Sequence, residues 1–296
     1  MPSPAVEFEL TTTDGVKLAG EEAGEGTPII LLHGLTATRR YVLMGSRVLE
    51  RSGHRVISYD ARGHGRSGAA PAPDAYSYEL LASDLEAVLD QLQVQRAVLA
   101  GASMGAQTAI RFALDHPERV AALGLITPAF DPDAPRRPDV YAGWDRLARG
   151  LREKGVEGFL AAYDLDAVPE RWRETVTTVV CQRLSAHDYP LALADSLEAI
   201  PRSRPFESWG DLGRISVQTL VVASCDEADP GHPLAIAERY AATIPCARLI
   251  VEEPGSSPIA WQGGQLSKAL AELMVQASAA DGSPGSSTIA PRNSAA

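Results

Sequence analysis

Cysteine is scarce in this chain of 296 residues. Only Cys181, Cys225 and Cys246 are present. The number is odd, and the spacing does not match the paired cysteines that bind zinc or build a disulfide framework. We therefore expect no structural disulfide and no metal site, and no motif calls for a cofactor.

Basic residues and long apolar runs are also in short supply. Lys and Arg total 27 against 38 acidic residues, which gives a formal net charge of −11. Nucleic acid or an anionic membrane surface would need a basic face, so neither is an expected partner. No stretch of eighteen apolar residues occurs, and Met1-Pro2-Ser3-Pro4 does not resemble a secretion signal. We expect a cytoplasmic protein. The sequence does not indicate its oligomeric state.

The most informative stretch is an apolar run that ends in Gly101-x-Ser103-x-Gly105 and passes directly into a helical pattern. A strand that turns sharply into a helix strains the residue at the bend, so its neighbours two positions away must be small. The two glycines meet that need. They leave the Ser103 hydroxyl at the tip of the sheet, facing the N–H groups at the start of a helix. The pattern predicts a nucleophile elbow.

Strand and helix patterns alternate around this stretch. Short apolar runs at 28–32, 56–59 and 120–126 are typical of buried strands, and 78–92 has the spacing of an amphipathic helix. An earlier pair of alternating segments around Asp14-Gly15 predicts a hairpin. The alternation resumes with strands at 219–223 and 248–251 and helices at 233–242 and 262–277. We expect an α/β fold with a mostly parallel eight-stranded sheet, helices on both faces and antiparallel first strands.

Between the two blocks of alternation, residues 128–205 show helical patterns and no buried strand. We interpret this segment as a helical cap over the end of the sheet that carries Ser103, since ligands bind at the carboxyl ends of such strands. A helical insertion without a binding role is the alternative. Tyr141 and Trp144 are candidate substrate-binding residues, although each also fits a packing role. The predicted organisation is a core of 1–127 and 206–279, a cap of 128–205 and a disordered tail of 280–296.

Four features together resemble the cap-bearing α/β-hydrolase superfamily, over about 6–277. They are the elbow, the His33-Gly34 turn, the loop from Asp60 to Ser67 and the segment 116–120. The resemblance implies that Ser103 is the nucleophile. It also implies that the backbone N–H groups of Leu35 and Met104 form an oxyanion hole, while His33 braces its loop. These motifs specify the fold and leave the substrate open.

The resemblance places a catalytic acid after the strand 219–223. The segment that follows offers Asp226 and Asp229. The family pattern has a proline a few residues after the aspartate. Asp229, which precedes Pro233 by four positions, matches this pattern better than Asp226. An acidic loop before a helix is the alternative interpretation of either residue.

The catalytic base departs from the family pattern. Chain order places a histidine in the loop after the last strand, where the family usually has Gly-His-Ser-Pro and this chain has Gly255-Ser256-Ser257-Pro258. Ser256 therefore stands at the position of a missing base, and we expect it to lie where an imidazole would bridge Ser103 and the acid. Of the six histidines, His187 and His232 are the plausible substitutes. We interpret the first as a polar residue on the cap surface and the second as a helix cap.

Two functions compete on this basis. The first is a hydrolase, or a related cofactor-free lyase, that acts on a small apolar ester, lactone or related carbonyl substrate through Ser103, with a missing or relocated base. The second is a weak or inactive homologue that binds a small apolar ligand under its cap. The retained Ser103 favours the first. A structural or interaction protein has little support, because it would not require an elbow.

Overall fold

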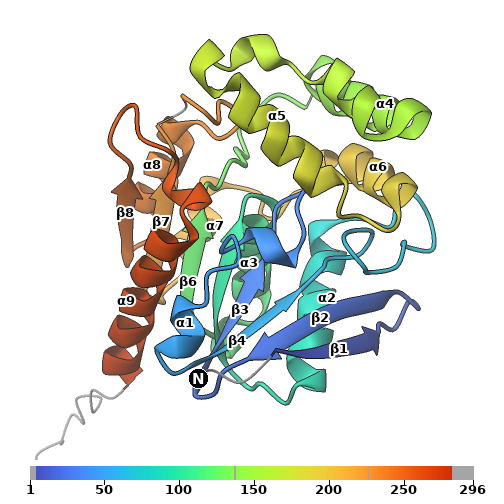
Figure 1. Ribbon diagram of the computed structural model, residues 1–296. Coiled ribbons are helices and arrows are strands. Elements are labelled where there is room, and N and C mark those ends of the chain that lie inside the picture. Colours follow the sequence, from blue (N-terminus) through green and yellow to red (C-terminus); the bar gives the residue numbers. More distant parts are fainter. Residues whose placement is uncertain (1–4, 137, 226, 282–296) are drawn as a thin grey trace, which may run out of the picture.

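The computed structural model describes residues 5–136, 138–225 and 227–281. The strands in these ranges form one eight-stranded sheet (Figure 1). The strand order is β1-β2-β4-β3-β5-β6-β7-β8. Strand β2 pairs antiparallel with β1 and β4, and all other neighbours are parallel. The strands are β1 (Val6–Thr11), β2 (Lys17–Ala23), β3 (Thr27–Leu32), β4 (His54–Tyr59), β5 (Ala97–Ala102), β6 (Val120–Ile126), β7 (Thr219–Ala223) and β8 (Ala247–Val251). The expected mostly parallel α/β sheet is confirmed.

Helices cover both faces of the sheet, because its central strands are apolar on both sides. Strands β5 and β7 are buried along nearly their whole length. One face packs against α2, α3 and α8, and the other against α1 and α9. The α-helices are α1 (Val48–Arg51), α2 (Tyr78–Gln91), α3 (Met104–Asp115), α4 (Pro138–Ala162), α5 (Glu170–Leu184), α6 (Pro190–Ala199), α7 (Trp209–Leu212), α8 (Leu234–Thr243) and α9 (Gly263–Asp281).

Short 3-10 turns complete the chain, at Arg39–Tyr41, Pro117–Arg119, Leu165–Ala167, Ile200–Arg202 and Ile259–Trp261. The region between β3 and β4 contains little helix, only one 3-10 turn and the four-residue α1 among its described residues. Met44 and Gly45 both adopt positive φ, which interrupts any helix through this segment.

Helices α4, α5 and α6 lie together beyond the carboxyl ends of the parallel strands, at the top of Figure 1. Helix α4 is broken at Lys154 and Gly155, where the backbone leaves helical geometry. Apolar residues of α4 and α6 form a common cluster with Leu35 and Met104. This layer therefore covers the end of the sheet that carries Ser103.

The C-terminal part of the chain differs slightly from expectation. Helix α9 continues to Asp281, so the tail cannot begin at 280. The remainder of the segment expected to be disordered, 282–296, lies outside the described residues. Within the described ranges, no helix is both long and apolar enough to cross a membrane.

Candidate functional site

Ser103 occupies the sharp turn between β5 and α3, as the elbow interpretation requires. Its backbone has φ 50° and ψ −109°, a strained conformation for a residue with a side chain. The flanking glycines are sterically necessary. A Cβ on Gly101 would lie 2.2 Å from the backbone of Gly105, and a Cβ on Gly105 would lie 2.1 Å from Leu32 O. Close packing of strand, turn and helix thus holds the hydroxyl at the tip of the sheet.

The loop after β3 runs alongside this turn. A Cβ on Gly34 would lie 3.5 Å from the Cβ of Ser103, so the backbone here is close to the serine. The next residue, Leu35, is buried, and its carbonyl lies 2.6 Å from His64 Nε2. Met104 is the first residue of α3, where backbone N–H groups have no partner within the helix. Leu35 and Met104 therefore flank Ser103 from two different elements.

The imidazole of His232 lies between Ser103 and Asp229. Ser103 Oγ is 2.8 Å from His232 Nε2, and Asp229 Oδ1 is 2.7 Å from His232 Nδ1. With the proton on Nδ1, the ring donates to the carboxylate and accepts from the serine hydroxyl. This is the hydrogen-bond relay by which an imidazole can take the proton of a serine.

A single turn in the loop after β7 brings the aspartate and the histidine together. His232 N–H donates to Asp229 O at 3.1 Å, which closes a four-residue turn with Pro230 and Gly231 at its centre. Proline at the second position of a turn restricts φ and favours this geometry. Residues three apart in sequence thus place their side chains in contact.

Asp229 is held in its charged form. Burial alone would raise the pKa of this carboxyl group, but attraction and hydrogen bonding to His232, together with the charge of Arg183, lower it below its ordinary value. A carboxylate that stays ionised can orient the imidazole and stabilise a positive charge on it.

Ser256 does not occupy the place expected for it. The residue is exposed, and its N–H closes a turn to Glu253 O at 3.0 Å. The imidazole between Ser103 and the aspartate belongs to His232, so the expected position of Ser256 is wrong. His232 also does not cap a helix, since α8 has Pro233 at its N-cap position. Asp226, the other candidate acid, lies outside the described residues.

The other substitute base, His187, is buried rather than on the cap surface. Its Nδ1 accepts the N–H of Gly65 at 2.9 Å, and its Nε2 lies 3.2 Å from Thr36 O. Burial lowers the pKa of His187 to about 4, with a smaller contribution from the nearby His64. His33 accepts the N–H of Ala61 at 2.9 Å and so braces its loop. The rings of His187 and His33 thus connect neighbouring loops through hydrogen bonds.

A cavity of about 340 Å³ opens beside the Asp229–His232 turn. Trp144, Leu147 and Tyr163 line one side of it, and Pro230 and Gly231 line the other. Its wall is mostly apolar. Trp144, one of the two candidate substrate-binding residues, therefore lines this cavity. Tyr141 is not part of this wall, because its ring packs under Arg202, whose Cζ lies 4.7 Å from the ring centroid.

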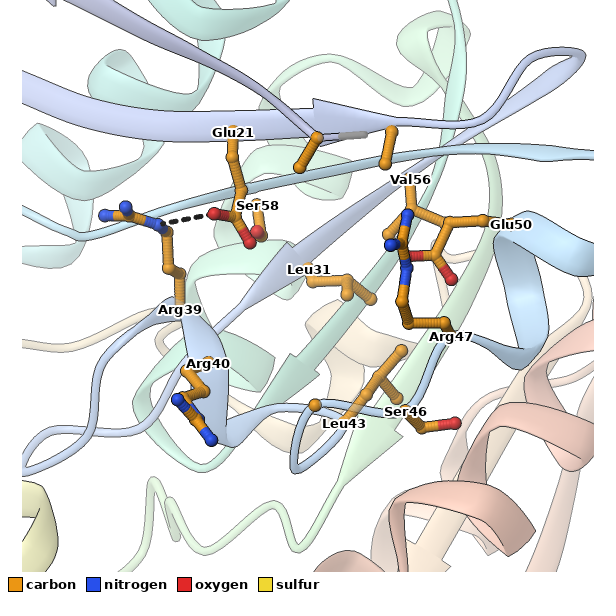
Figure 2. Close-up of a pocket in the computed structure, with 13 residues that line it drawn as sticks. Glu21, Leu31, Arg39, Arg40, Leu43, Ser46, Arg47, Glu50, Val56 and Ser58 are labelled. Carbon is orange, nitrogen blue, oxygen red and sulfur yellow. Dashed lines mark ion pairs between the residues drawn. The ribbon is translucent and has the colours of Figure 1, made fainter. Parts of the chain in front are cut away.

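Another hollow lies away from the elbow, between the segment after β3 and the strands β2 and β4 (Figure 2). Its volume is about 230 Å³. Arg39 contributes its guanidinium, whose Nε is 3.6 Å from a carboxylate oxygen of Glu21. Neither Ser103 nor the Asp229–His232 turn reaches this hollow, so we do not assign the chemistry to it. In the described part of the chain, no cluster of three or more His, Cys, Asp or Glu side chains is arranged to hold a metal ion.

Comparison with known proteins agrees with this architecture. Residues 27–263 match the family model described as alpha/beta hydrolase fold. A putative 2-succinyl-6-hydroxy-2,4-cyclohexadiene-1-carboxylate synthase from Bacillus subtilis is 28% identical over 90% of this chain and 97% of its own length. A putative carbamate hydrolase from Variovorax paradoxus is 31% identical over 69% of this chain and 75% of its own length.

Solved structures with similar folds include a malate-bound thermophilic esterase from Thermogutta terrifontis. It is 28% identical with a TM-score of 0.74, and the match covers 93% of this chain and 99% of the esterase. An enol-lactonase from Burkholderia xenovorans has a TM-score of 0.73 at 23% identity, over 90% of this chain and all of the other, and shows likeness of fold. The sheet, the elbow and the family match agree, and the chain belongs to the α/β-hydrolase superfamily.

Proposed function

We propose that this protein hydrolyses small carboxylic esters or lactones, with Ser103 as nucleophile, His232 as general base and Asp229 as the carboxylate that orients it. The observation that carries this proposal is the relay in which His232 contacts Ser103 at 2.8 Å and Asp229 at 2.7 Å. Relatives described as an esterase and a hydrolase support the same reaction class.

The reaction proceeds in two halves. Ser103 Oγ attacks the substrate carbonyl carbon while His232 Nε2 takes the serine proton. The tetrahedral intermediate then collapses. The bond to the alkoxy group breaks, and His232 returns its proton to the departing alcohol. In the second half, water attacks the acyl-Ser103 ester and gives its proton to His232. That proton passes back to Ser103 Oγ as the acid leaves.

The negative charge of each tetrahedral intermediate requires hydrogen-bond donors. We assign this role to the backbone N–H groups of Leu35 and Met104, which flank Ser103 from the loop after β3 and from the start of α3. One such donor contributes on the order of 3 kcal/mol to transition-state stabilisation. The N-terminus of α3 adds a favourable dipole at the same point.

We further propose that 128–205 acts as a cap and that the cavity beside Trp144 receives part of the substrate. Its wall is apolar, which suits an acyl chain or a hydrocarbon ring. Tyr141 is the weaker candidate for substrate contact, because Arg202 covers its ring. The competing function, ligand binding by an inactive homologue, depended on the lack of a base, and His232 supplies one.

The test combines labelling with kinetics. The wild-type protein should react with a fluorophosphonate probe and hydrolyse p-nitrophenyl acetate, and Ser103→Ala should lose both properties. A wild-type protein that folds but neither labels nor hydrolyses would reject the proposal in favour of ligand binding.

A further inference from the structure

Helix α5 carries three arginines, and two of them have clear partners. Arg171 pairs with Glu227, and Arg173 pairs with Asp166 at 3.3 Å and donates to Val168 O at 2.9 Å. The side chain of the third, Arg183, has no hydrogen bond and no ion pair within the described residues. Its Nε is shielded from solvent and has no acceptor. Because a guanidinium is costly to bury without an anion, this arrangement is unusual.

The surroundings of Arg183 place it at the candidate active site. Its Cζ lies 5.7 Å from the centroid of the Tyr41 ring, at the end of the 3-10 turn that follows the Leu35 loop. It also interacts electrostatically with Asp229 and with Tyr163, a residue of the cavity wall. The guanidinium therefore lies close to the segment after β3, to the Asp229–His232 turn and to the cavity beside Trp144.

Neither neighbour satisfies the guanidinium. Asp229 directs its carboxylate to His232 and forms no ion pair with Arg183. The face of the Tyr41 ring attracts a cation but accepts no hydrogen bond in the plane of the guanidinium. Burial without a hydrogen-bonded anion also lowers the pKa of Arg183 from its ordinary value, although the charge of Asp229 partly opposes this. The donors of Arg183 remain available to a ligand.

We propose that Arg183 binds a carboxylate group of the substrate, so that the preferred esters or lactones are anionic. Arginine suits this role, since its planar fork can donate two parallel hydrogen bonds to one carboxylate. The substrate carbonyl then lies at Ser103 while its carboxylate lies under α5. This inference rests on the hydrolytic function proposed above and adds the charge of the substrate to it.

The experiment compares matched esters that differ only in charge. On the acyl side, mono-p-nitrophenyl adipate is compared with p-nitrophenyl hexanoate. On the alcohol side, 4-(carboxymethyl)phenyl acetate is compared with 4-ethylphenyl acetate. The measured quantity is the ratio of kcat/KM for the anionic ester to that for the neutral ester. We expect a ratio above one in at least one pair, carried mainly by a lower KM for the anion.

Variants then assign that preference to a residue. Arg183→Gln should lower the ratio by at least about tenfold, because a hydrogen bond to a charged group is lost. Arg183→Lys retains the positive charge but cannot donate two parallel hydrogen bonds to one carboxylate, so its ratio should lie between those of the wild type and Arg183→Gln. Arg173→Gln removes the same charge from the same helix and should leave the ratio unchanged. Circular dichroism checks the fold of each variant, and the lysine variant decides the question if the glutamine variant does not fold.

Two results would overturn the inference while leaving the hydrolytic function in place. One is a wild-type ratio at or below one in both pairs with ready hydrolysis of the neutral esters. The other is an equal loss of kcat/KM for anionic and neutral esters in Arg183→Gln. That result would mean that Arg183 acts by stabilising the charge of Asp229. Failure of the hydrolytic function itself differs from both, because no ester would then be cleaved and Ser103 would not be labelled.

Discussion

His232 contacts Ser103 from the loop after β7, although the superfamily pattern places the base in the loop after β8. The aspartate partner lies in the same turn, only three residues earlier. In this chain one short loop carries both the aspartate and the histidine that we propose as acid and base, and Ser256 in the β8 loop is exposed. The predictions below test this arrangement and its consequences.

Removal of the imidazole should abolish most of the activity. We expect His232→Ala to lower kcat for p-nitrophenyl acetate on the order of 10³-fold, because Ser103 then has no group to accept its proton. His116→Ala, at the exposed end of α3, is the matched control and should retain wild-type kinetics. Near-normal activity in His232→Ala would show that another group acts as the base.

The carboxylate partner should matter through its charge. Asp229→Asn keeps the size of the side chain but removes the anion that orients and stabilises the imidazole, so we expect kcat to fall at least about 100-fold. The pKa of Asp229 is lowered, so the carboxylate stays ionised throughout the range in which esterases are assayed. Wild-type kcat in Asp229→Asn would contradict this assignment of Asp229.

Much of this architecture follows from the sequence alone. Gly101 and Gly105 are required wherever a strand turns into a helix around a strained serine, so the elbow and its flanking elements could be predicted from local sterics. The helical patterns between 128 and 205 likewise correspond to α4, α5 and α6. The elbow and these helices can be predicted because they depend on residues that are close together in the sequence.

The contact between His232 and Ser103 was harder to predict from the sequence. His232 lies 129 positions from Ser103, so their contact depends on the tertiary fold. A local signal does exist, because an Asp-Pro-Gly-His turn brings its first and fourth side chains together. The family pattern, which places the histidine at position 256, and Pro233, which indicates the start of a helix, both favour a different interpretation of His232. Similarly, the lack of a hydrogen-bond acceptor for Arg183 Nε among the described residues depends on what surrounds α5 in space.

The β8 loop should not be able to take over the role of the base. Ser256 is exposed and its N–H bonds within its own turn, so we expect an imidazole at this position to remain in solvent. We expect Ser256→His to change kcat/KM by less than about twofold, as is usual for an exposed surface substitution. The same change in the His232→Ala background should restore no activity. A rise of tenfold or more in either background would show that position 256 still faces the nucleophile.

Three buried histidines should make the protein sensitive to acid. The rings of His33, His64 and His187 pack at centroid distances of 5.1 and 5.6 Å, the first pair tilted and the second edge to face, and they join the loops after β3 and β4 to the segment after α5. Burial lowers the pKa of His33 to about 3 and that of His187 to about 4. Both rings are neutral in the folded protein at pH 5, whereas in the unfolded chain they bind protons below about pH 6.5. Because the unfolded state binds more protons, the free energy of unfolding falls as the pH drops from 6.5 toward the folded pKa values.

Urea unfolding at a series of pH values measures this effect. We expect His187→Gln, which keeps an acceptor for the Gly65 N–H, to remove about 2 kcal/mol of the stability difference between pH 7 and pH 4.5. His116→Gln is the control, since this side chain is 33% exposed and lies outside the group of three buried histidines, and the variant should keep the wild-type loss of stability between pH 7 and pH 4.5. An unchanged slope in His187→Gln would mean that acid acts on other groups and that the neutral imidazole of His187 does not couple the fold to pH.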